Sequence, residues 1–297
     1  MAKARKILKR AKSIKSIRTV TKTMEMVATA RFRKSHQRVV ATKPFVDRLA
    51  DVVSGMCGGG LDDISHPLLR AKSEVKRTAM LVITSNRGLA GAFNSSVLRT
   101  AVERVKQLHE AGEDVELHVV GKRGLQFMRF RKLAVTKAYT QFDKTITFEQ
   151  ASEVADTFMD LLVTGKINNL EVAYMQFISS GKQKPVVAKV LPLTELTTGV
   201  QQFAPGAGAA AANYELIPSG QEILQVLLPL SVRMKIYQCF LDSAVSEQMM
   251  RIAAMRSATD AADDMVHDLT ILYNRSRQGQ ITTELAEIMG GRVGLEE

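Results

Sequence analysis

The stretch SEQMMRIAAMRSATDAADDMVHDLTILYNRSRQ, residues 246–278, contains neither glycine nor proline in thirty-three positions. A row of residues that begins just before it, at Leu241, recurs through it at alternating steps of three and four, which is a period of 3.5. That period keeps one face of a helix turned toward a single partner helix and is typical of a coiled coil. The row consists of Leu241, Val245, Gln248, Ile252, Met255, Thr259, Ala262, Val266, Leu269, Tyr273 and Ser276.

The flanking residues predict the bounds of this helix. Pro218 and Ser219 indicate its start, and Pro229 is expected to kink it or to split off its first turns. Gly290 and Gly291 indicate its end. A continuous helix after Pro229 would be on the order of 90 Å long at about 1.5 Å per residue, so much of it must stand clear of any globular part.

A second row with a similar period lies near the N-terminus. It predicts a helix that runs to about Lys43, where Pro44 interrupts or kinks the chain. This is the simplest partner for the C-terminal helix, so the two ends of the chain are expected to form one coiled coil. The row consists of Ile7, Ala11, Ile14, Ile17, Met24 and Ala28, with Thr21 in the gap.

The C-terminal row is rich in small residues, among them Thr259, Ala262 and Ser276. Small residues allow close approach of two helices but bury little apolar area. The coiled coil is therefore expected to be stabilised partly by protein that surrounds it, in the manner of a sleeve.

The net charge of +11 is concentrated in the N-terminal helix. Residues 1–38 contain thirteen Lys and Arg but one acid, Glu25, whereas the remainder of the chain nets −1. Three interpretations fit: a targeting presequence, a nucleic-acid-binding arm, and a helix that meets an acidic protein. A presequence is usually shorter, and a nucleic-acid arm usually interleaves aromatic residues, whereas Phe32 is the first aromatic here.

The composition sets further limits. No apolar run approaches the roughly 20 residues that cross a bilayer, so any link to a membrane is expected to involve a partner or surface charge. Cys57 and Cys239 are far apart and too few for a zinc site or a disulfide framework. Both are interpreted as buried thiols of a protein in a reducing compartment.

The middle of the chain alternates between strands and helices. This order predicts a parallel α/β sheet with a terminal antiparallel pair. The domain boundaries that follow are an N-terminal helix 1–60, an α/β domain 75–195, a Gly/Ala-rich linker 196–218 and a C-terminal helix 219–297. The expected strands are 77–85, 114–121, 132–139, 169–179 and 184–193, and the expected helices are about 94–111, 121–131 and 147–165.

The α/β domain contains no motif of an active site. TSNRGLAGAFN, 84–94, suggests a nucleotide loop, but it lacks both GxxxxGK[ST] and GxGxxG with a following acid. Arg87 is interpreted as a solvated turn residue, and Asp263 with Asp264 as a solvated helix face. We therefore expect no catalytic residue, cofactor or metal. The histidines are scattered at His36, His66, His109, His118 and His267.

Four stretches of the sequence together resemble the gamma subunits of rotary F-type ATP synthases. They are SIKSIRTVTKTMEMVATARFRKS (13–35), SNRGLAGAFN (85–94), SEQMMRIAAMRSATD (246–260) and YNRSRQGQITTELAEIMGG (273–291). The resemblance extends from the first residues to the last. It implies a long antiparallel coiled coil of N- and C-terminal helices plus a central Rossmann-like α/β domain, in a bacterial-type chain that begins at Met1 without a presequence.

The resemblance also implies a function. The chain would be the central rotor shaft, which couples ion-driven rotation of the membrane ring to conformational change at catalytic sites on the beta subunits and is not itself catalytic. The implied partners are the alpha, beta and epsilon subunits and the membrane c-ring, with no nucleic acid and no direct insertion into the bilayer. The implied location is peripheral, at the cytoplasmic face of the bacterial inner membrane.

Matching motifs imply contact residues at the end of the shaft and at its middle. Arg277 and Gln278 would hydrogen-bond to a loop of the beta subunit, with Thr282 and Glu284 close by. Met24 and its neighbours would lie where the shaft passes an acidic segment of beta, which would give the basic helix its partner. Arg251 belongs to the same region on the other helix.

The foot that meets the membrane ring would include Tyr214 and Glu215 and, more loosely, SNRGLAGAFN. Ala90 and Ala261 depart from the Cys and Asn of many family members, and the dithiol of the chloroplast branch is missing, so redox control through a disulfide is not expected. Two other classes of function remain as alternatives: a basic coiled-coil protein that binds nucleic acid, and an α/β enzyme with a cryptic nucleotide site.

Overall fold

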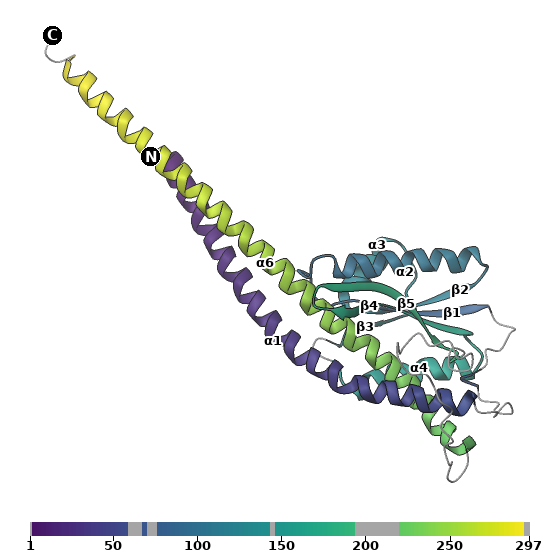
Figure 1. Cartoon of the computed structure of the whole chain (residues 1–297). Coiled ribbons are helices and arrows are strands. Elements are labelled where there is room, and N and C mark those ends of the chain that lie inside the picture. The colour runs from purple at the N-terminus through teal and green to yellow at the C-terminus, as the bar shows by residue number, and fades with distance from the viewer. Residues whose placement is uncertain (1, 59–66, 70–75, 143–145, 194–219, 294–297) are drawn as a thin grey trace. The chain divides into compact units, whose positions relative to one another are not determined.

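A computed structural model describes residues 2–58, 67–69, 76–142, 146–193 and 220–293. The chain divides into two compact units. The coiled-coil unit comprises residues 1–29 and 251–297, and the α/β unit comprises residues 30–250. The helices α1 (Ala2–Gly58) and α6 (Gly220–Val293) each contribute to both units (Figure 1).

The sequence predicts that the N-terminal helix runs to about Lys43. In the structure, helix α1 continues through Pro44 to Gly58. Proline inside a helix costs about 3 kcal/mol because it removes one backbone hydrogen bond and crowds the preceding turn. After Pro44, however, Leu49 and Val53 are buried in the core of the α/β unit. Burial of two such side chains stabilises the extension by about as much as the proline costs.

Helix α6 begins at Gly220, close to the predicted start, and Pro229 likewise lies inside it. It continues to Val293, beyond the predicted stop at Gly290. The apolar residues at its start, including Leu224 and Leu228, are fully buried in the α/β unit. This burial explains why Pro229 does not separate those turns from the rest of the helix.

In the coiled-coil unit the two helices run antiparallel. Arg18 on α1 forms an ion pair with Asp263 on α6, and the hydroxyls of Thr21 and Thr259 lie 2.8 Å apart. As the α1 residue number rises, its partner's number falls, which defines an antiparallel pair. The C-terminal row is confirmed as the contact face of α6, since Met255, Thr259 and Ala262 are buried in it.

The N-terminal row is confirmed only in part. Ile17 and Met24 were expected at the helix contact but are 55% and 39% exposed. The residues of α1 that face α6, which we call the inner row, continue from Ile14 to Arg18 instead of to Ile17. This step of four keeps the heptad spacing regular. The side chains of the inner row are buried or half-buried except for the ion-paired Arg18. It consists of Ala4, Ile7, Ala11, Ile14, Arg18, Thr21, Glu25 and Ala28.

The buried threonine pair yields a test of this packing. Thr259→Val should destabilise the helix pair by about 1 kcal/mol because it removes one cross-helix hydrogen bond. Adding Thr21→Val should recover most of that loss, because both polar partners are then replaced by apolar groups of similar shape. Thermal unfolding followed by circular dichroism would measure both effects. Thr270→Val, at an exposed threonine of the same helix, is the control, and equal losses in all three variants would contradict the pairing.

The α/β unit contains a five-stranded sheet of order β3-β2-β1-β4-β5. Strands β1, β2, β3 and β4 are parallel to one another, and β5 pairs antiparallel with β4. The predicted parallel sheet with a terminal antiparallel pair is thus confirmed. The strands are β1 Arg77–Ile83, β2 Asp114–Val120, β3 Lys137–Tyr139, β4 Asn169–Ser179 and β5 Lys182–Leu191.

Two layers of helices cover the sheet (Figure 1). Helices α2 (Phe93–Glu110) and α3 (Lys122–Phe130) pack on one face, and α4 (Phe148–Val163) packs on the other. The parts of α1 and α6 that belong to this unit join the core on the α4 side. The central strand β1 is consequently buried on both faces, which accounts for its continuous run of apolar residues.

Strand β3 is shorter than the predicted strand 132–139. Lys132 adopts a left-handed backbone conformation with φ 56°, and its N–H donates to the carbonyl of Arg129 at 3.0 Å. The N–H of Leu133 donates to the carbonyl of Met128 at 3.0 Å. These bonds close the end of α3, so the residues before Lys137 form a helix cap and a turn instead of a strand.

Candidate functional site

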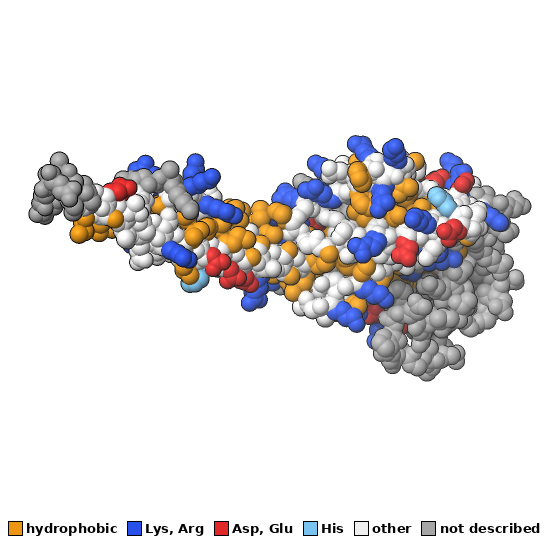
Figure 2. Space-filling view, turned by 90° about the horizontal axis from the view of Figure 1, so that it is seen from above, with side chains coloured by type: hydrophobic (Ala, Val, Ile, Leu, Met, Phe, Trp, Pro, Cys, Tyr) orange, Lys and Arg blue, Asp and Glu red, His pale blue; other side chains and the backbone are white. Residues whose placement is uncertain are grey.

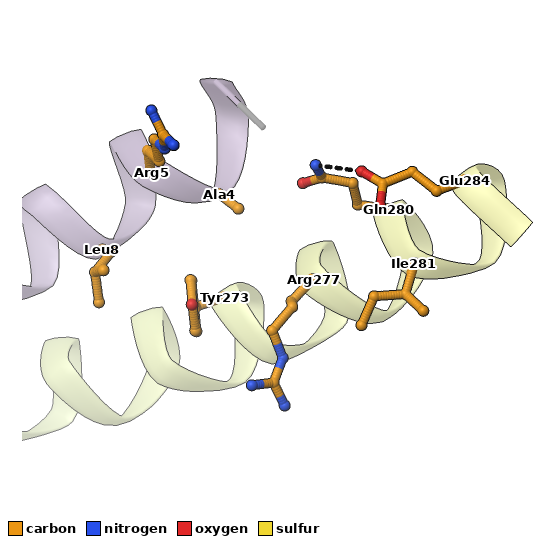
Figure 3. A pocket seen from close by; sticks show the side chains of 8 residues that line it. All are labelled: Ala4, Arg5, Leu8, Tyr273, Arg277, Gln280, Ile281 and Glu284. Carbon is orange, nitrogen blue, oxygen red and sulfur yellow. Dashed lines mark hydrogen bonds between the residues drawn. The ribbon is translucent and has the colours of Figure 1, made fainter.

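The predicted contact residues at the end of the shaft lie beside an open groove between α1 and α6 (Figure 3). The groove has a volume of about 260 Å³. Tyr273 reaches toward Leu8 of α1, whereas the guanidinium of Arg277 points away from α1. The lining residues are Ala4, Arg5, Leu8, Tyr273, Arg277, Gln280, Ile281 and Glu284.

The four predicted residues in this region are all exposed, but they occupy two neighbouring faces of α6. Arg277 and Glu284 both line the groove, and Gln280 donates a hydrogen bond to Glu284 at 3.0 Å. Gln278 and Thr282 are one turn apart on the adjacent face, where the Thr282 hydroxyl donates to the Gln278 backbone carbonyl at 3.0 Å. Both side chains are exposed, so an external surface can reach the Gln278 amide and the acceptor side of the Thr282 hydroxyl.

The helix α6 continues beyond the end of α1 in the coiled-coil unit (Figure 1). In this extension the apolar side chains of Ile281, Leu285, Ile288 and Met289 are between 49% and 70% exposed. Their spacing of three and four residues places them along one side of the helix. An apolar stripe of this kind fits an apolar protein environment, which the sequence predicts in the form of a sleeve.

A second exposed apolar row lies on α1, one position before the inner row at each step. We call Ile17, Val20, Met24 and Val27 the outer row, and their side chains are between 39% and 55% exposed. The view in Figure 2 shows apolar side chains on the outside of the coiled coil. The sequence pattern places Ile17 and Met24 in the same row as the residues of the helix contact. The outer row repeats with the same heptad spacing as the inner row but is offset by one residue, and this offset is the signal that distinguishes the two rows.

The other predicted contact residues have different surroundings. Arg251 is half-buried on α6 and interacts with other residues of the chain. Tyr214 and Glu215, predicted for the foot, lie outside the described residues. The two parts of the predicted site that the structure describes are therefore the distal end of α6 and the outer row with its basic neighbours.

The basic residues of α1 form an exposed charged surface around the outer row. The side chains of Lys9, Arg10, Lys12 and Lys15 are all exposed, and the Lys22 ammonium lies 3.0 Å from Glu25. Closely spaced exposed cations of this kind attract an acidic protein surface before the two surfaces are in contact. The combination of a cationic surface with an apolar row is suited to a protein contact more than to solvent alone.

The loop that resembles a nucleotide site is closed by internal bonds. The Ser85 N–H donates to Asn94 Oδ1 at 3.0 Å, and the Thr84 hydroxyl donates to the Val120 carbonyl at 2.6 Å. The first three N–H groups of α3, which would be available to a phosphate, donate to protein acceptors instead. Lys122, Arg123 and Gly124 donate to Asn86 Oδ1, the Ser85 carbonyl and Thr84 Oγ1, respectively.

The described residues also bear on metal binding and on membrane insertion. In the described ranges, no three His, Cys, Asp or Glu side chains come close enough together to hold a metal ion. Across the same residues, none of the helices combines the length and the apolar character that crossing a bilayer requires. Cys239 is a buried free thiol, as predicted, and burial raises its pKa to about 12.

Comparison with known proteins identifies close relatives along the whole chain. Residues 3–295 match the protein family described as ATP synthase. A protein of Rhodopirellula baltica called ATP synthase gamma chain is 41% identical over 296 residues, covering 100% of both chains. A protein of the same name from Leptospira biflexa is 37% identical and covers 98% of both chains.

Solved structures show the same fold at lower sequence identity. A chain of the Euglena gracilis mitochondrial ATP synthase, in a structure of OSCP, F1 and the c-ring, aligns with a TM-score of 0.69 at 16% identity, covering 99% of this chain and 95% of that one. A chain of the Tetrahymena thermophila central stalk and c-ring aligns with a TM-score of 0.56 at 20% identity, covering 80% and 99%. The combination of a terminal coiled coil and a five-stranded α/β unit is thus a known architecture.

Proposed function

The chain belongs to the ATP synthase family as a gamma chain, and from this premise we propose that it couples rotation of a membrane ring to conformational change at catalytic sites on beta subunits. The observation that best supports this role is the exposed apolar surface of the coiled coil. The outer row on α1 and the stripe on the distal end of α6 are both left in solvent by the packing of the chain on itself. A ring of surrounding subunits would cover both.

The composition of the helix pair supports a turning shaft rather than a fixed plug. The inner contact relies on small and polar residues such as Thr21, Thr259 and Ala262, which hold the two helices together at short range. The outward-facing apolar side chains make no directional bonds, so an apolar bearing around them imposes little resistance to rotation. The shaft would be stabilised by its bearing while it remains free to turn.

Specific contacts would be made by polar groups on the same shaft. We propose that Arg277 and Gln278 hydrogen-bond to a loop of the beta subunit, with Thr282 and Glu284 beside them. All four are exposed on the distal part of α6. The guanidinium of Arg277 points away from α1, which makes it available to a surrounding chain (Figure 3).

The outer row and the basic face of α1 would meet an acidic segment of beta at Met24, with Arg251 on the other helix. Tyr214 and Glu215 would belong to the foot that meets the membrane c-ring, and an epsilon subunit would bind the same rotor. The chain would be peripheral, on the cytoplasmic face of a bacterial inner membrane. These assignments follow from family membership together with the exposed charge of α1.

The mechanism follows from the asymmetry of two different helices. One side of the shaft presents the outer row of α1, and another presents α6, so the beta subunits around it meet different surfaces. Each beta subunit is then stabilised in a different conformation, and a turn of the shaft exchanges these conformations among them. The gamma chain itself transmits torque and needs no nucleotide, which agrees with the closed loop at Ser85.

A double substitution tests the proposed function. Arg277→Ala combined with Gln278→Ala should lower coupled ATP synthesis in reconstituted vesicles about tenfold or more, because losing the charged hydrogen bond to a partner alone costs about 1.5 kcal/mol or more. The isolated chain should keep its helical circular dichroism, because both side chains are exposed.

The matched control is Arg99→Ala combined with Gln107→Ala, which removes the same residue types from exposed positions on α2. This control should leave synthesis near the wild-type rate. Failure of the wild-type chain to assemble with alpha and beta subunits would contradict the proposed function. Loss of helical signal in the first variant would show that the two residues stabilise the fold.

A further inference from the structure

A second basic region lies in the α/β unit, apart from the basic face of α1. Between Gly121 and Phe142 the sequence contains six Lys and Arg and no Asp or Glu. This local charge of +6 contrasts with the net −1 of the chain after residue 38. We call these six residues the α3 basic cluster; they are Lys122, Arg123, Arg129, Arg131, Lys132 and Lys137.

All six side chains of the cluster are exposed. Within the described part of the chain, none of them forms an ion pair with an acidic side chain, since the ion pairs present involve other cations. Three of them have neutral partners: Arg123 donates to Gln126 Oε1 at 3.5 Å, Arg131 lies 5.6 Å from the Phe127 ring centre, and Lys137 lies 5.1 Å from that of Tyr139. The described residues therefore leave this concentrated positive charge without a neutralising acidic side chain.

An exposed aromatic residue lies within the sequence of the cluster. Phe130, between Arg129 and Arg131 at the end of α3, is 83% exposed, the largest value among the exposed apolar side chains of the described residues. Figure 2, which looks onto the side of α2 and α3, shows basic side chains around apolar ones on the α/β unit. An exposed phenylalanine between arginines is the composition of an energetic centre in protein interfaces.

We propose that the α3 basic cluster and Phe130 form a docking surface for an acidic segment of another protein subunit. Carboxylates of the partner would bind Arg129, Arg131 and Lys132, and an apolar pocket of the partner would cover Phe130. Arginine forms paired hydrogen bonds with a carboxylate, which gives such a contact orientation as well as attraction.

The structure favours a protein over a membrane or a nucleic acid. An amphipathic helix that binds a membrane presents a whole apolar face to the lipid. In α3 the apolar residues Gly124 and Met128 are buried against the sheet, so that face is already used. A nucleic-acid surface generally offers several aromatic rings for stacking, whereas Phe130 is the only strongly exposed ring of α3.

The test uses the complete ATP synthase complex. The proposal rests on the proposed function only because the partner is sought among the subunits of that complex. A photo-crosslinking amino acid placed at position 130 should capture one subunit of the purified complex, within a segment rich in Asp and Glu identified by mass spectrometry. Arg129→Glu, Arg131→Glu and Lys132→Glu combined should lower the crosslink yield about tenfold or more, because like charges then face each other.

The matched control reverses three exposed cations elsewhere in the α/β unit: Arg99→Glu, Lys106→Glu and Lys166→Glu. It changes the net charge equally and should preserve the crosslink. Equal loss in both variants, or a crosslink to a segment without acidic residues, would overturn the proposal.

Two further outcomes would also overturn it. Sedimentation of the chain with vesicles of phosphatidylglycerol, abolished by the first charge reversal and without a protein crosslink, would assign the surface to a membrane. Salt-dependent binding to DNA with the same pattern would assign it to nucleic acid. If the complex assembled without any crosslink at position 130, the docking surface would be refuted and the proposed function would stand. If the wild-type chain failed to assemble, the proposed function would be refuted.

Discussion

Gly121→Ala is expected to destabilise the α/β unit by about 3 kcal/mol or more, enough to unfold a large fraction of the chain at 37 °C. Gly121 has φ 94°, which an L side chain rarely adopts. A Cβ atom there would lie 2.4 Å from the Thr84 carbonyl oxygen and 2.8 Å from that of Ser85. Both contacts are far closer than two nonbonded atoms tolerate.

The backbone around Gly121 has little freedom to relieve this clash. Its N–H donates to the Tyr139 carbonyl at 2.9 Å, and the Thr84 N–H donates to the Val120 carbonyl at 3.0 Å. The Thr84 hydroxyl also accepts the Gly124 N–H at 3.0 Å. Moving any of these groups would break bonds that join β1, β2, β3 and the start of α3.

Gly112 provides a matched control, because it also has a positive φ, of 76°, but no atom lies within 4 Å of its Cβ position. Gly112→Ala should therefore cost only about 1 kcal/mol, the effect of backbone conformation alone. Urea unfolding followed by circular dichroism would compare the two variants. If Gly121→Ala lost no more stability than Gly112→Ala, the close approach of the Thr84 and Ser85 carbonyls to Gly121 would be contradicted.

Periodicity predicted the fold well where one contact repeats over many turns. The C-terminal row from Leu241 to Ser276 and the strands β1 and β2 have their predicted places, because burial on a fixed period leaves a direct trace in the sequence. The prediction at Pro44 considered only the free-energy cost of a proline inside a helix. Burial of Leu49 and Val53 in the core of the α/β unit, which is formed by residues far away in sequence, outweighs that cost.

The candidate site was less predictable than the fold. The inner row includes Arg18 and Glu25, so the apolar pattern placed Ile17 and Met24 in the helix contact, although both belong to the separate outer row. Arg277, Gln278, Thr282 and Glu284 came from family resemblance, because exposed polar residues on a helix have no periodic signature of contact. The six cations of the α3 basic cluster can be read from the sequence. The net charge of the chain after residue 38 is only −1, so a count over that whole region does not reveal them.

Asp242→Asn is expected to stabilise the α/β unit at pH 8 by about 2 to 4 kcal/mol. Asp242 is 7% exposed on α6, and burial raises the pKa of its carboxyl from the ordinary 3.8 to about 7. The Gln238 amide, which donates to Oδ1 at 2.9 Å, and the charge of Lys43 lower this pKa but do not cancel the effect of burial. The Cys239 thiol and the Tyr174 hydroxyl also face the carboxyl, and neither supplies a positive charge.

The sign of the pH dependence follows from the two pKa values. The unfolded chain releases the Asp242 proton near pH 4, whereas the folded chain retains it to about pH 7. Stability contributed by the protonated carboxyl is thus present below pH 4 and is lost as the pH rises toward 7, by about 1.4 kcal/mol per pH unit in that window. Asparagine stays neutral throughout, so its advantage should be about 2.7 kcal/mol smaller at pH 5 than at pH 8, from about 1.4 kcal/mol for each of the two pH units between 5 and 7.

Urea unfolding of both proteins at pH 5, 6, 7 and 8 would measure this difference. His118 has the opposite trend, because burial lowers its pKa to about 4 and stability falls as the pH drops from 6.5. That effect is common to both proteins and cancels in their comparison. Asp160→Asn, at an exposed position of α4, is the control for removing a carboxylate. A constant difference between Asp242→Asn and the wild type at all four pH values would show that Asp242 is ionised in the folded chain throughout, with a cation or water replacing the hydration that burial removes.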